Sequence, residues 1–416
     1  MRGRAFALRP PALVDRRLCR RVSPGCAGDF PSRFRANAKR LRYRASALLD
    51  PGVGGVVTDR FRRYIHMNKK IHVAVLGATG AVGQKFVYLL QDHPTFDVAE
   101  LVASPRNRGK RYAEAATWHE TGEIPDTIAN MKLKGIDESL DSQVLLSGLD
   151  SSVAGEAEEA YAKAGHMVIS NAKNHRMDAN VPLVIPEINA AHIHLVKEQP
   201  WSGGIITNPN CSTMFLALAL APLHRAFGIK SVQVTTLQAI SGAGYPGVPS
   251  MDILGNIVPY ISGEEDKVET EANKILGAVE NGTTVPAEFP VSAQCTRVPV
   301  ADGHTESVSV ELSEKVDVSR LREVMTAFTG PPQELGLPSA PENPLQIIDE
   351  PNRPQPLRDV SREGGMVTWI GRIRPCPVAD YKMIVLGHNT IRGAAGAAIL
   401  NAEMAQALGY IKHPGA

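Results

Sequence analysis

A short apolar segment that runs into a glycine-rich turn and then a helix constrains the fold most. Ile71–Leu76 (IHVAVL) is apolar and rich in β-branched residues, which is typical of a buried parallel strand. Glycines follow at Gly77, Gly80 and Gly83, and 81–90 has apolar residues at helical spacing. Such a strand, turn and helix begin a βαβ unit that binds a pyrophosphate. The GxxGxxG spacing is not the commoner GxGxxG, and a glycine-rich turn can be purely structural, but we predict a dinucleotide site here. Its residues are Gly77, Ala78, Thr79, Gly80, Ala81, Val82 and Gly83.

The end of the next expected strand, 98–103, indicates which dinucleotide is bound. A protein that binds NAD tends to place an Asp or Glu about 20 residues beyond the glycines, where it contacts the ribose. This chain has Ser104 and Arg106 there, within the basic run SPRNRGKR. A hydroxyl and cations suit the 2′-phosphate of NADP, whereas a solvated basic loop is the alternative. We therefore expect NADP as the cofactor.

Strands and helices continue to alternate after this unit. A doubly wound parallel sheet with its ligand-binding strand ends on one side is expected. Its further strands are expected at 143–147, 167–170 and 203–207, with a helix at 153–164.

The following part of the chain predicts a second, mixed sheet. A helix at 318–328 is expected to cover it, and the proline-rich segment 339–358 is expected to be a long surface excursion. Its strands are expected at 231–240, 292–300, 304–313 and 366–374. The predicted fold class is α/β, a Rossmann-like NADP-binding domain with an α+β domain.

Length and charge limit the partners of the chain. Its 416 residues suffice for two domains, and no apolar run approaches the ~20 residues that span a bilayer. The net charge of +2 points to no nucleic-acid or membrane partner. Residues 1–66 are rich in Arg and poor in acidic residues, so they are either a transit peptide or the result of a misassigned start before Met67. In either case we expect this segment to be disordered and outside the fold.

The cysteines suggest neither a disulfide framework nor a metal site. They are few, scattered and odd in number, and none has the spacing of zinc ligands. We therefore expect no metal cofactor and a reducing compartment, the cytoplasm, or an organelle if residues 1–66 are a transit peptide. The five are Cys19, Cys26, Cys211, Cys295 and Cys376.

One of these cysteines, Cys211, is the candidate nucleophile. It stands in Asn-Pro-Asn-Cys-Ser-Thr, between the expected strand 203–207 and an apolar helix, 214–227. A helix N-terminus stabilises a thiolate, so we expect a lowered thiol pKa. Ser212 and Thr213 are the expected N-caps of the helix. A buried structural thiol is the alternative for Cys211 and the preferred interpretation of Cys295 and Cys376.

Three segments give the chain a specific resemblance. NPNCST, SNAKNHR and LQAISGAGYPG resemble aspartate-semialdehyde dehydrogenases of the archaeal and fungal branch, and the similarity extends from about residue 70 to 409. The resemblance implies that NADPH reduces L-aspartyl 4-phosphate to L-aspartate 4-semialdehyde and phosphate through a Cys211 thioester. This step belongs to the aspartate-derived pathway to lysine, methionine, threonine and isoleucine. It also implies an NADP-binding domain of 67–210 plus 386–416, a catalytic and dimerisation domain of 211–385, and a homodimer or homotetramer.

The resemblance also assigns roles to residues around Cys211. Arg297 matches the arginine that binds the substrate carboxylate, and a guanidinium suits this through two parallel hydrogen bonds. His304, seven residues later, matches the catalytic histidine that transfers a proton. Gln238 matches the glutamine that positions the substrate. Alone, Arg297 is more often a surface charge and His304 a turn residue, and the segment of Gln238 is also compatible with a simple glycine-rich loop after a strand.

The substrate's ammonium and phosphate also have expected partners. Glu264 matches the residue that contacts the ammonium, and Lys267, Arg176 and Asn210 match the phosphate contacts. Glu264 and Lys267, just before an expected helix at 268–276, are equally compatible with an ordinary ion pair. Lys173 departs from the Ser of many family members, and we expect it to add to anion or cofactor binding if it faces the pocket.

The nicotinamide end of the cofactor is expected to contact Ser241, Gly242 and Asn389, the last at the start of a small-residue helix that ends near Gly409. Three alternatives stay open. They are a malonyl-CoA reductase of the same superfamily, an N-acetyl-glutamyl-phosphate reductase, and a non-catalytic NADP-binding sensor.

Overall fold

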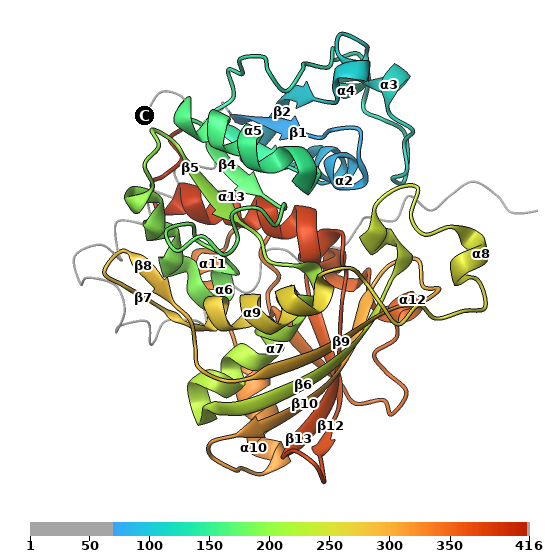
Figure 1. The fold of residues 1–416 in the computed structure, drawn as a ribbon, viewed down its shortest axis with the longest axis vertical. Coiled ribbons are helices and arrows are strands. Elements are labelled where there is room, and N and C mark those ends of the chain that lie inside the picture. The colour runs from blue at the N-terminus through green and yellow to red at the C-terminus, as the bar shows by residue number, and fades with distance from the viewer. Residues whose placement is uncertain (1–69, 414–416) are drawn as a thin grey trace, which may run out of the picture. The chain divides into compact units, whose positions relative to one another are not determined.

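The computed structural model describes residues 70–413, in which two sheets share one long C-terminal helix (Figure 1). The first sheet has five strands in the order β2-β1-β3-β4-β5, and every pairing is parallel. This confirms the expected Rossmann-like sheet, with strand bounds within a few residues of those predicted. The strands are β1 (Ile71–Leu76), β2 (Phe96–Val102), β3 (Val144–Ser147), β4 (Met167–Ser170) and β5 (Gly204–Thr207).

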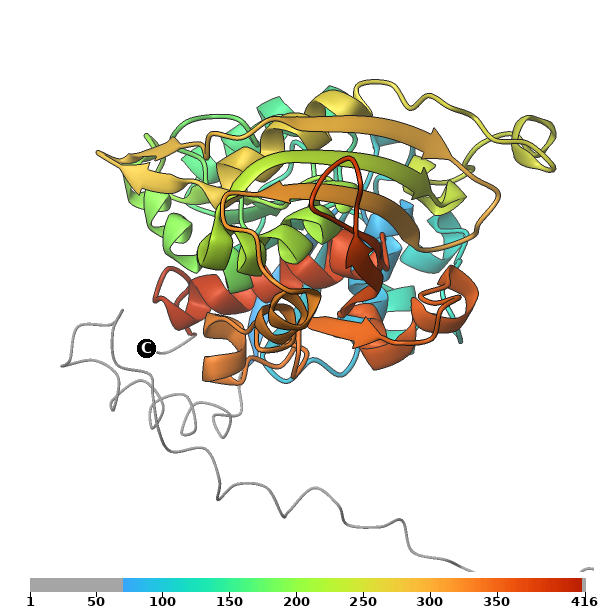
Figure 2. The same cartoon turned by 90° about the horizontal axis from the view of Figure 1, so that it is seen from below.

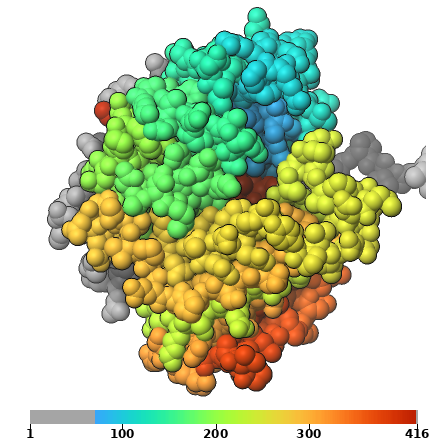
Figure 3. Space-filling view, in the orientation of Figure 1, coloured from blue at the N-terminus to red at the C-terminus, as the bar shows by residue number. Residues whose placement is uncertain are grey.

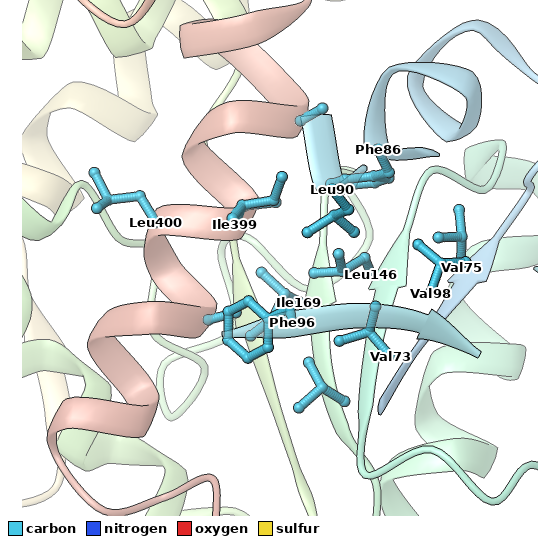
Figure 4. Close-up of a cluster of buried hydrophobic side chains, with 14 of the residues drawn as sticks. Val73, Val75, Phe86, Leu90, Phe96, Val98, Leu146, Ile169, Ile399 and Leu400 are labelled. Atoms are coloured by element: carbon cyan, nitrogen blue, oxygen red, sulfur yellow. The ribbon is translucent and has the colours of Figure 1, made fainter. Parts of the chain in front are cut away.

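Helices cover both faces of this sheet. Alternate residues of each strand point to opposite faces, so each face carries apolar side chains that the helices bury. α2 (Ala81–Leu90) and α13 (Gly396–Ala407) share one hydrophobic cluster with the sheet, and α5 (Ser151–Lys163) belongs to the cluster on the other face. Figure 4 shows Ile399 of α13 and Leu90 of α2 beside strand residues such as Ile169. A fully buried side chain of this size contributes about 1.5–3 kcal/mol. The C-terminal helix is therefore an integral layer of the nucleotide sheet.

The second sheet has six strands in the mixed order β11-β12-β13-β10-β6-β9. Figure 2 shows its long strands β6, β9 and β10, which are hydrogen-bonded neighbours. Its strands are β6 (Ile229–Gln238), β9 (Val291–Arg297), β10 (His304–Leu312), β11 (Leu345–Ile348), β12 (Thr368–Pro375) and β13 (Tyr381–Gly387).

Two of these strands were not expected from the sequence. The proline-rich excursion contains β11, which pairs in parallel with β12 at the edge of the sheet. Proline is tolerated at sheet edges, so the prolines that flank β11 do not prevent this pairing. The expectation of a long surface excursion at 339–358 is wrong in this respect, because four of its residues form a strand of the sheet. The sequence analysis also missed β13, which lies between β10 and β12.

Three helices pack on one face of the second sheet. α7 (Cys211–Phe227), α9 (Glu264–Leu276) and α10 (Val318–Thr326) share one hydrophobic cluster with the inward residues of the strands. In β6 these are Val232 and Val234, which alternate with exposed residues. α7 and α9 each begin three or more residues earlier than expected, so their first turns carry the candidate site residues.

The remaining elements are short. They are α3 (Tyr112–Ala115), α4 (Asp126–Ala129), α6 (Pro186–Asn189), α8 (Ser250–Ile253), α11 (Pro331–Leu335), α12 (Pro356–Asp359), β7 (Ala278–Glu280), β8 (Thr283–Val285), the 3₁₀ helices Pro105–Asn107, Ala190–Glu198, Ile240–Ala243 and Arg362–Gly365, and a π-helix, Ile391–Ala395. Within residues 70–413, no helix is long and apolar enough to cross a membrane. The expectations for residues 1–66, including Cys19 and Cys26, lie outside the described residues.

Candidate active site

Cys211 is the first residue of α7, and Asn210 is the N-cap of that helix. The side-chain oxygen of Asn210 accepts hydrogen bonds from the N–H groups of Ser212 (2.9 Å) and Thr213 (3.2 Å). Ser212 and Thr213 were expected to be the caps, and this is wrong, because both already lie inside the first turn. Capping by Asn210 fixes the direction in which Cys211 leaves the sheet.

Two carboxylates of α9 hold Asn210 in place. Glu264 Oε1 lies 2.7 Å from the Asn210 side-chain nitrogen, and Glu271 Oε2 lies 2.6 Å from its backbone nitrogen. Both carboxylates are buried, with 6% and 2% of their surfaces exposed. The sequence analysis missed Glu271, although it stands seven residues after Glu264 and therefore on the same face of the helix.

The two expected phosphate-binding cations are each paired with one of these carboxylates. Lys267 lies 2.9 Å from Glu264, and Arg176 lies 2.9 Å from Glu271. A second guanidinium nitrogen of Arg176 donates to the carbonyl of Asn171 at 2.6 Å. The structure therefore brings all four expected partners of ammonium and phosphate into one network around Asn210.

Gln238 and Arg297 lie at the adjacent ends of two parallel strands. Gln238, at the end of β6, is paired in register with Arg297, at the end of β9. Gln238 is buried and its amide donates to Glu264 at 3.2 Å, which joins it to the Asn210 network. Arg297 Nη1 donates to the carbonyl of Ala239 at 2.8 Å.

The first residue of β10, His304, is held by the same short segment. The N–H of Ala239 lies 3.0 Å from His304 Nδ1, so Nδ1 must act as the acceptor. The neutral ring then carries its proton on Nε2, which is buried and has no hydrogen-bond partner in residues 70–413. Burial lowers the pKa of His304 to about 3, with a further contribution from Arg297. His304 is therefore a neutral hydrogen-bond donor in the resting site.

The protonation state of the Cys211 thiol differs from the one that the sequence predicted. Burial raises the pKa of Cys211 to about 12, and the Glu264 carboxylate adds to this rise. Arg176, Arg297 and the N–H of Ser212 oppose it without reversing it. The expectation of a lowered pKa at the helix start is therefore wrong for the resting site, because desolvation and a neighbouring carboxylate outweigh the helix and the cations. Cys211 nevertheless stays partly accessible to solvent.

Two glycines allow the backbone to approach these groups closely. A Cβ on Gly242 would lie 2.7 Å from Arg297 Nη1 and 3.0 Å from His304 Nε2. A Cβ on Gly393, in the π-helix, would lie 2.8 Å from the Cβ of Cys211. These segments cover the reacting groups from two sides, so a side chain at either position would displace one of them.

The expected dinucleotide turn has the geometry that its glycines require. Gly77 has a positive φ of 74°, and a Cβ on Gly83 would lie 2.2 Å from the carbonyl oxygen of Gly77. The N-cap of α2, Gly80, offers no side-chain acceptor to the first turn of the helix. The N–H of Ala78 donates to Val102 at 2.9 Å, which places the turn beside the end of β2. These observations fit a pyrophosphate at the start of α2.

The basic loop after β2 contains one cation without a partner. Ser104 and Arg106 are exposed, and among the described residues Arg106 makes neither a hydrogen bond nor an ion pair. By contrast, Arg108 pairs with Asp137 and Glu138 at 3.2 and 2.8 Å. Arg106 is therefore the loop arginine that is available to a bound phosphate.

A cleft of about 330 Å³ lies between the nucleotide turn and the segment after β6. Figure 3 shows the hollow between the blue-green and yellow parts of the surface. Ala81 and Ser241 line it, whereas Ser104 and Arg106 do not, so the cleft lies at the end of the site where the nicotinamide is expected rather than at the expected 2′-phosphate end. Lining residues that the sequence analysis missed are Lys85, His119, Glu120, Tyr245, Asp302 and Thr390.

Asn389 joins the two loops that border this cleft. Its amide nitrogen lies 2.8 Å from the Ser241 hydroxyl, and its oxygen accepts the N–H of Gly303 at 2.8 Å. Lys173 is exposed. It helps to lower the pKa of Asp150, after the larger effect of hydrogen bonds from Ser152. Among residues 70–413, Lys173 makes no hydrogen bond or ion pair with the Asn210 network.

Known proteins resemble the chain along both sheets. Residues 72–196 match the family described as semialdehyde dehydrogenase, NAD binding domain, and residues 220–392 match semialdehyde dehydrogenase, dimerisation domain. The chain is 48% identical to the aspartate-semialdehyde dehydrogenase of Methanothermobacter thermautotrophicus, covering 80% of this chain and 98% of that protein. It is 46% identical to that of Schizosaccharomyces pombe, covering 80% and 97%. The structure of aspartate semialdehyde dehydrogenase with NADP from Candida albicans matches with a TM-score of 0.77 and 45% identity, covering 82% of this chain and 100% of that chain.

A Rossmann-like sheet beside a cysteine at a helix start and a neutral imidazole defines a nicotinamide-dependent dehydrogenase that uses a thiol. At this degree of identity over nearly the whole length of its relatives, the chain belongs to the aspartate-semialdehyde dehydrogenase family. The resemblance to its archaeal and fungal branch is confirmed.

Proposed function

We propose that the protein catalyses the NADPH-dependent reduction of L-aspartyl 4-phosphate to L-aspartate 4-semialdehyde and phosphate. The observation that carries this proposal is the set of charges around one thiol. Arg176, Arg297 and Glu264 all lie close enough to Cys211 to shift its pKa. A substrate with a carboxylate, an ammonium and a phosphate requires such a set.

The geometry supports one role for each charged group. Arg297 retains guanidinium N–H groups for a carboxylate after its bond to Ala239. Arg176 and Lys267 are cations for the phosphate, and Glu264 is an anion for the ammonium. Gln238 and Asn210 are hydrogen-bonded to Glu264 and keep it in position.

The thioester step follows from the protonation states of the resting site. The Cys211 sulfur attacks the acyl carbon, the bond to phosphate breaks, and the thiol proton leaves with the phosphate. The Nε2–H of His304 donates a hydrogen bond to the acyl oxygen while it carries negative charge. After reduction the carbon–sulfur bond of the hemithioacetal breaks, the aldehyde departs, and the thiolate of Cys211 takes a proton from solvent, the one proton that the overall reduction consumes. Because His304 is neutral and fixed by Ala239, it acts as a donor rather than as the base for Cys211.

NADP fits the nucleotide site by its glycine cradle and by Arg106, which has no partner within the described part of the chain, residues 70–413. When bound, the nicotinamide supplies hydride in one direction and accepts it in the other. Ser104 and Arg106 would hold the 2′-phosphate, residues 77–83 the pyrophosphate, and Ser241, Gly242 and Asn389 the nicotinamide end.

The assembly and compartment of the protein are part of the same proposal. A homodimer or homotetramer is supported by the match to a dimerisation domain and by apolar side chains such as Met251 and Tyr260 that are exposed in the single chain. The two domains are proposed to be 67–210 plus 386–416 and 211–385. Because the proposed reaction depends on a reduced thiol, we propose that the protein is located in the cytoplasm, which is a reducing compartment.

A phosphate-dependence assay tests the proposed reaction. The protein is incubated with aspartate semialdehyde and NADP, and NADPH formation is followed with and without phosphate. We expect turnover that requires phosphate. Reduction of malonyl-CoA by NADPH is measured beside it, and turnover of malonyl-CoA together with no turnover of the semialdehyde would refute the proposal. A Cys211→Ala variant is expected to lose turnover, since no thioester forms, and wild-type rates in that variant would refute the mechanism.

A further inference from the structure

Among residues 70–413, Glu271 is the one buried carboxylate that contacts both the proposed phosphate arginine and the start of the Cys211 helix. Its Oε1 lies 2.9 Å from Arg176 Nη1, and its Oε2 lies 2.6 Å from the backbone nitrogen of Asn210. Only 2% of the residue is exposed. The two contacts join a loop after β4 to a loop after β5 through a side chain of α9.

Both partners of Glu271 are donors, and an ionised carboxylate is the side chain that offers two acceptor oxygens at this reach. A glutamine of the same shape has one acceptor, so its amide would face either the guanidinium or the Asn210 N–H, donor against donor. Charge-assisted hydrogen bonds of this kind are shorter and stronger than neutral ones. The carboxylate therefore fixes two atoms relative to each other.

α9 also holds the main chain that carries Arg176. The ammonium group of Lys274, of which 1% is exposed, donates to the carbonyl oxygens of Arg176 (2.7 Å), Asp178 (2.7 Å) and Val181 (2.9 Å). Burial lowers the pKa of Lys274 to about 8, and Asp178 and Glu271 oppose this shift. Lys274 anchors the loop of Arg176 and Glu271 anchors its guanidinium, so this arginine is ordered before any anion arrives.

We propose that Glu271 is a positioning residue for the phosphate step, which holds the Arg176 guanidinium and the Asn210 N–H in register with Cys211. This inference rests on the phosphate role proposed above for Arg176. A fixed cation avoids the ordering cost that a free arginine side chain would meet on binding. Glu271 does not touch the substrate in this scheme and acts only through its two partners.

Three variants of α9 test the inference. Glu271→Gln keeps the shape and removes one acceptor and the charge, and Glu271→Asp keeps both acceptors on a shorter side chain. Glu269→Gln is the matched control, because Glu269 also accepts a backbone N–H, that of Ala293 at 2.9 Å, but away from the Asn210 network. Thermal unfolding of each variant is measured beside its kinetics.

The KM for phosphate, in the direction of NADP reduction, separates positioning from structure. In Glu271→Gln the KM for phosphate is expected to rise by about tenfold, an effect that corresponds to one charged hydrogen bond. The kcat is expected to fall, and the KM for NADP to stay unchanged. Glu271→Asp is expected to recover part of the loss, and Glu269→Gln to match the wild type. An unchanged KM for phosphate in both Glu271 variants, or equal losses in Glu269→Gln, would overturn the inference.

A second measurement keeps the inference separate from the proposed reaction. Inorganic phosphate is titrated against alkylation of Cys211 by iodoacetamide, and the modified peptide is quantified by mass spectrometry. Protection of the wild type at about tenfold lower phosphate than Glu271→Gln supports the positioning role even if the semialdehyde is not turned over. Phosphate-dependent turnover of the wild type together with equal protection in both proteins overturns the positioning role alone.

Discussion

Removal of Arg106 tests the choice of cofactor most directly. The side chain is exposed and has no hydrogen bond or ion pair among the described residues, so Arg106→Ala breaks no contact in the free protein. A hydrogen bond between charged groups contributes about 1.5–3 kcal/mol, and solvent exposure favours the lower end, about 1.5–2 kcal/mol. Since 1.4 kcal/mol is a factor of ten, kcat/KM for NADP is expected to fall roughly 10- to 30-fold. NAD lacks the 2′-phosphate, so its kcat/KM should stay within about twofold.

Arg108→Ala is the control for this comparison, since Arg108 is in the same loop but is already paired with Asp137 and Glu138. Initial rates with both dinucleotides at several salt concentrations provide the measurement, because salt weakens an exposed phosphate contact. A parallel fall for NADP and NAD in Arg106→Ala would refute the reasoning. So would an equal effect of Arg108→Ala on NADP, because the loop would then act only through its net charge.

Substitutions at three further positions probe the centre of the site and the core. Gly393→Ala places a Cβ 2.8 Å from that of Cys211. We therefore expect kcat to fall by about 10- to 100-fold, with a smaller change in Tm. An unchanged kcat would show that the π-helix shifts freely to make room. His304→Ala should lower kcat by about 10²–10³, and His304→Gln should recover part of it by supplying an N–H donor; equal rates in the two variants would contradict the donor role. Glu187→Ala leaves the Arg392 guanidinium buried without its partner at 2.7 Å. The free energy of unfolding measured in urea should therefore fall by about 3–5 kcal/mol. A fall below about 1 kcal/mol would mean that water enters the site and solvates the guanidinium.

The sequence predicted the nucleotide sheet well because its signals are local. Apolar β-branched runs and a glycine turn identify β1 and α2 without knowledge of any distant residue. The apolar runs of β13 and β11 are shorter, at 383–386 and 347–348. β13 begins with Tyr381 and a lysine, although five of its seven residues are buried, and β11 stands among prolines. β13 pairs with β12 just before it and with β10 much earlier in the chain, so its place in the sheet depends in part on distant residues.

The candidate site divides in the same way. Cys211, Arg297 and His304 stand in motifs and were identified from them. Glu271 is in no motif of this kind, and its role depends on the fold bringing α9 beside the loops of Arg176 and Asn210. The lowered thiol pKa was a local argument from the helix start, and it failed because burial and Glu264 act through space. Contacts between segments distant in sequence thus decided both the missed residue and the incorrect protonation state.

The protonation state of Cys211 has a consequence that the protein itself can report. With a pKa raised to about 12 by burial, the thiolate fraction and the rate of alkylation should rise about tenfold per pH unit from pH 7 to 10, without a plateau. Cys376 is an internal control, since hydrogen bonds from Ala379 and Val378 lower its pKa and its alkylation should level off earlier. Peptide mapping after iodoacetamide treatment separates the two. A plateau for Cys211 near pH 6–7 would indicate a thiolate–imidazolium pair and would return His304 to the role of base.

If the alkylation rate rises with pH as expected, the thiol of the resting site is protonated. It then loses its proton only when an acyl phosphate arrives to take it. The order of events then follows from the chemistry of the substrate: the departing phosphate accepts the proton beside Arg176 and Lys267, where two cations stabilise the charge that it carries away. A simple thioester brings no such acceptor. In this scheme, a thiol of high pKa contributes to selectivity for an acyl phosphate over a thioester, because the acyl phosphate brings the group that removes the proton.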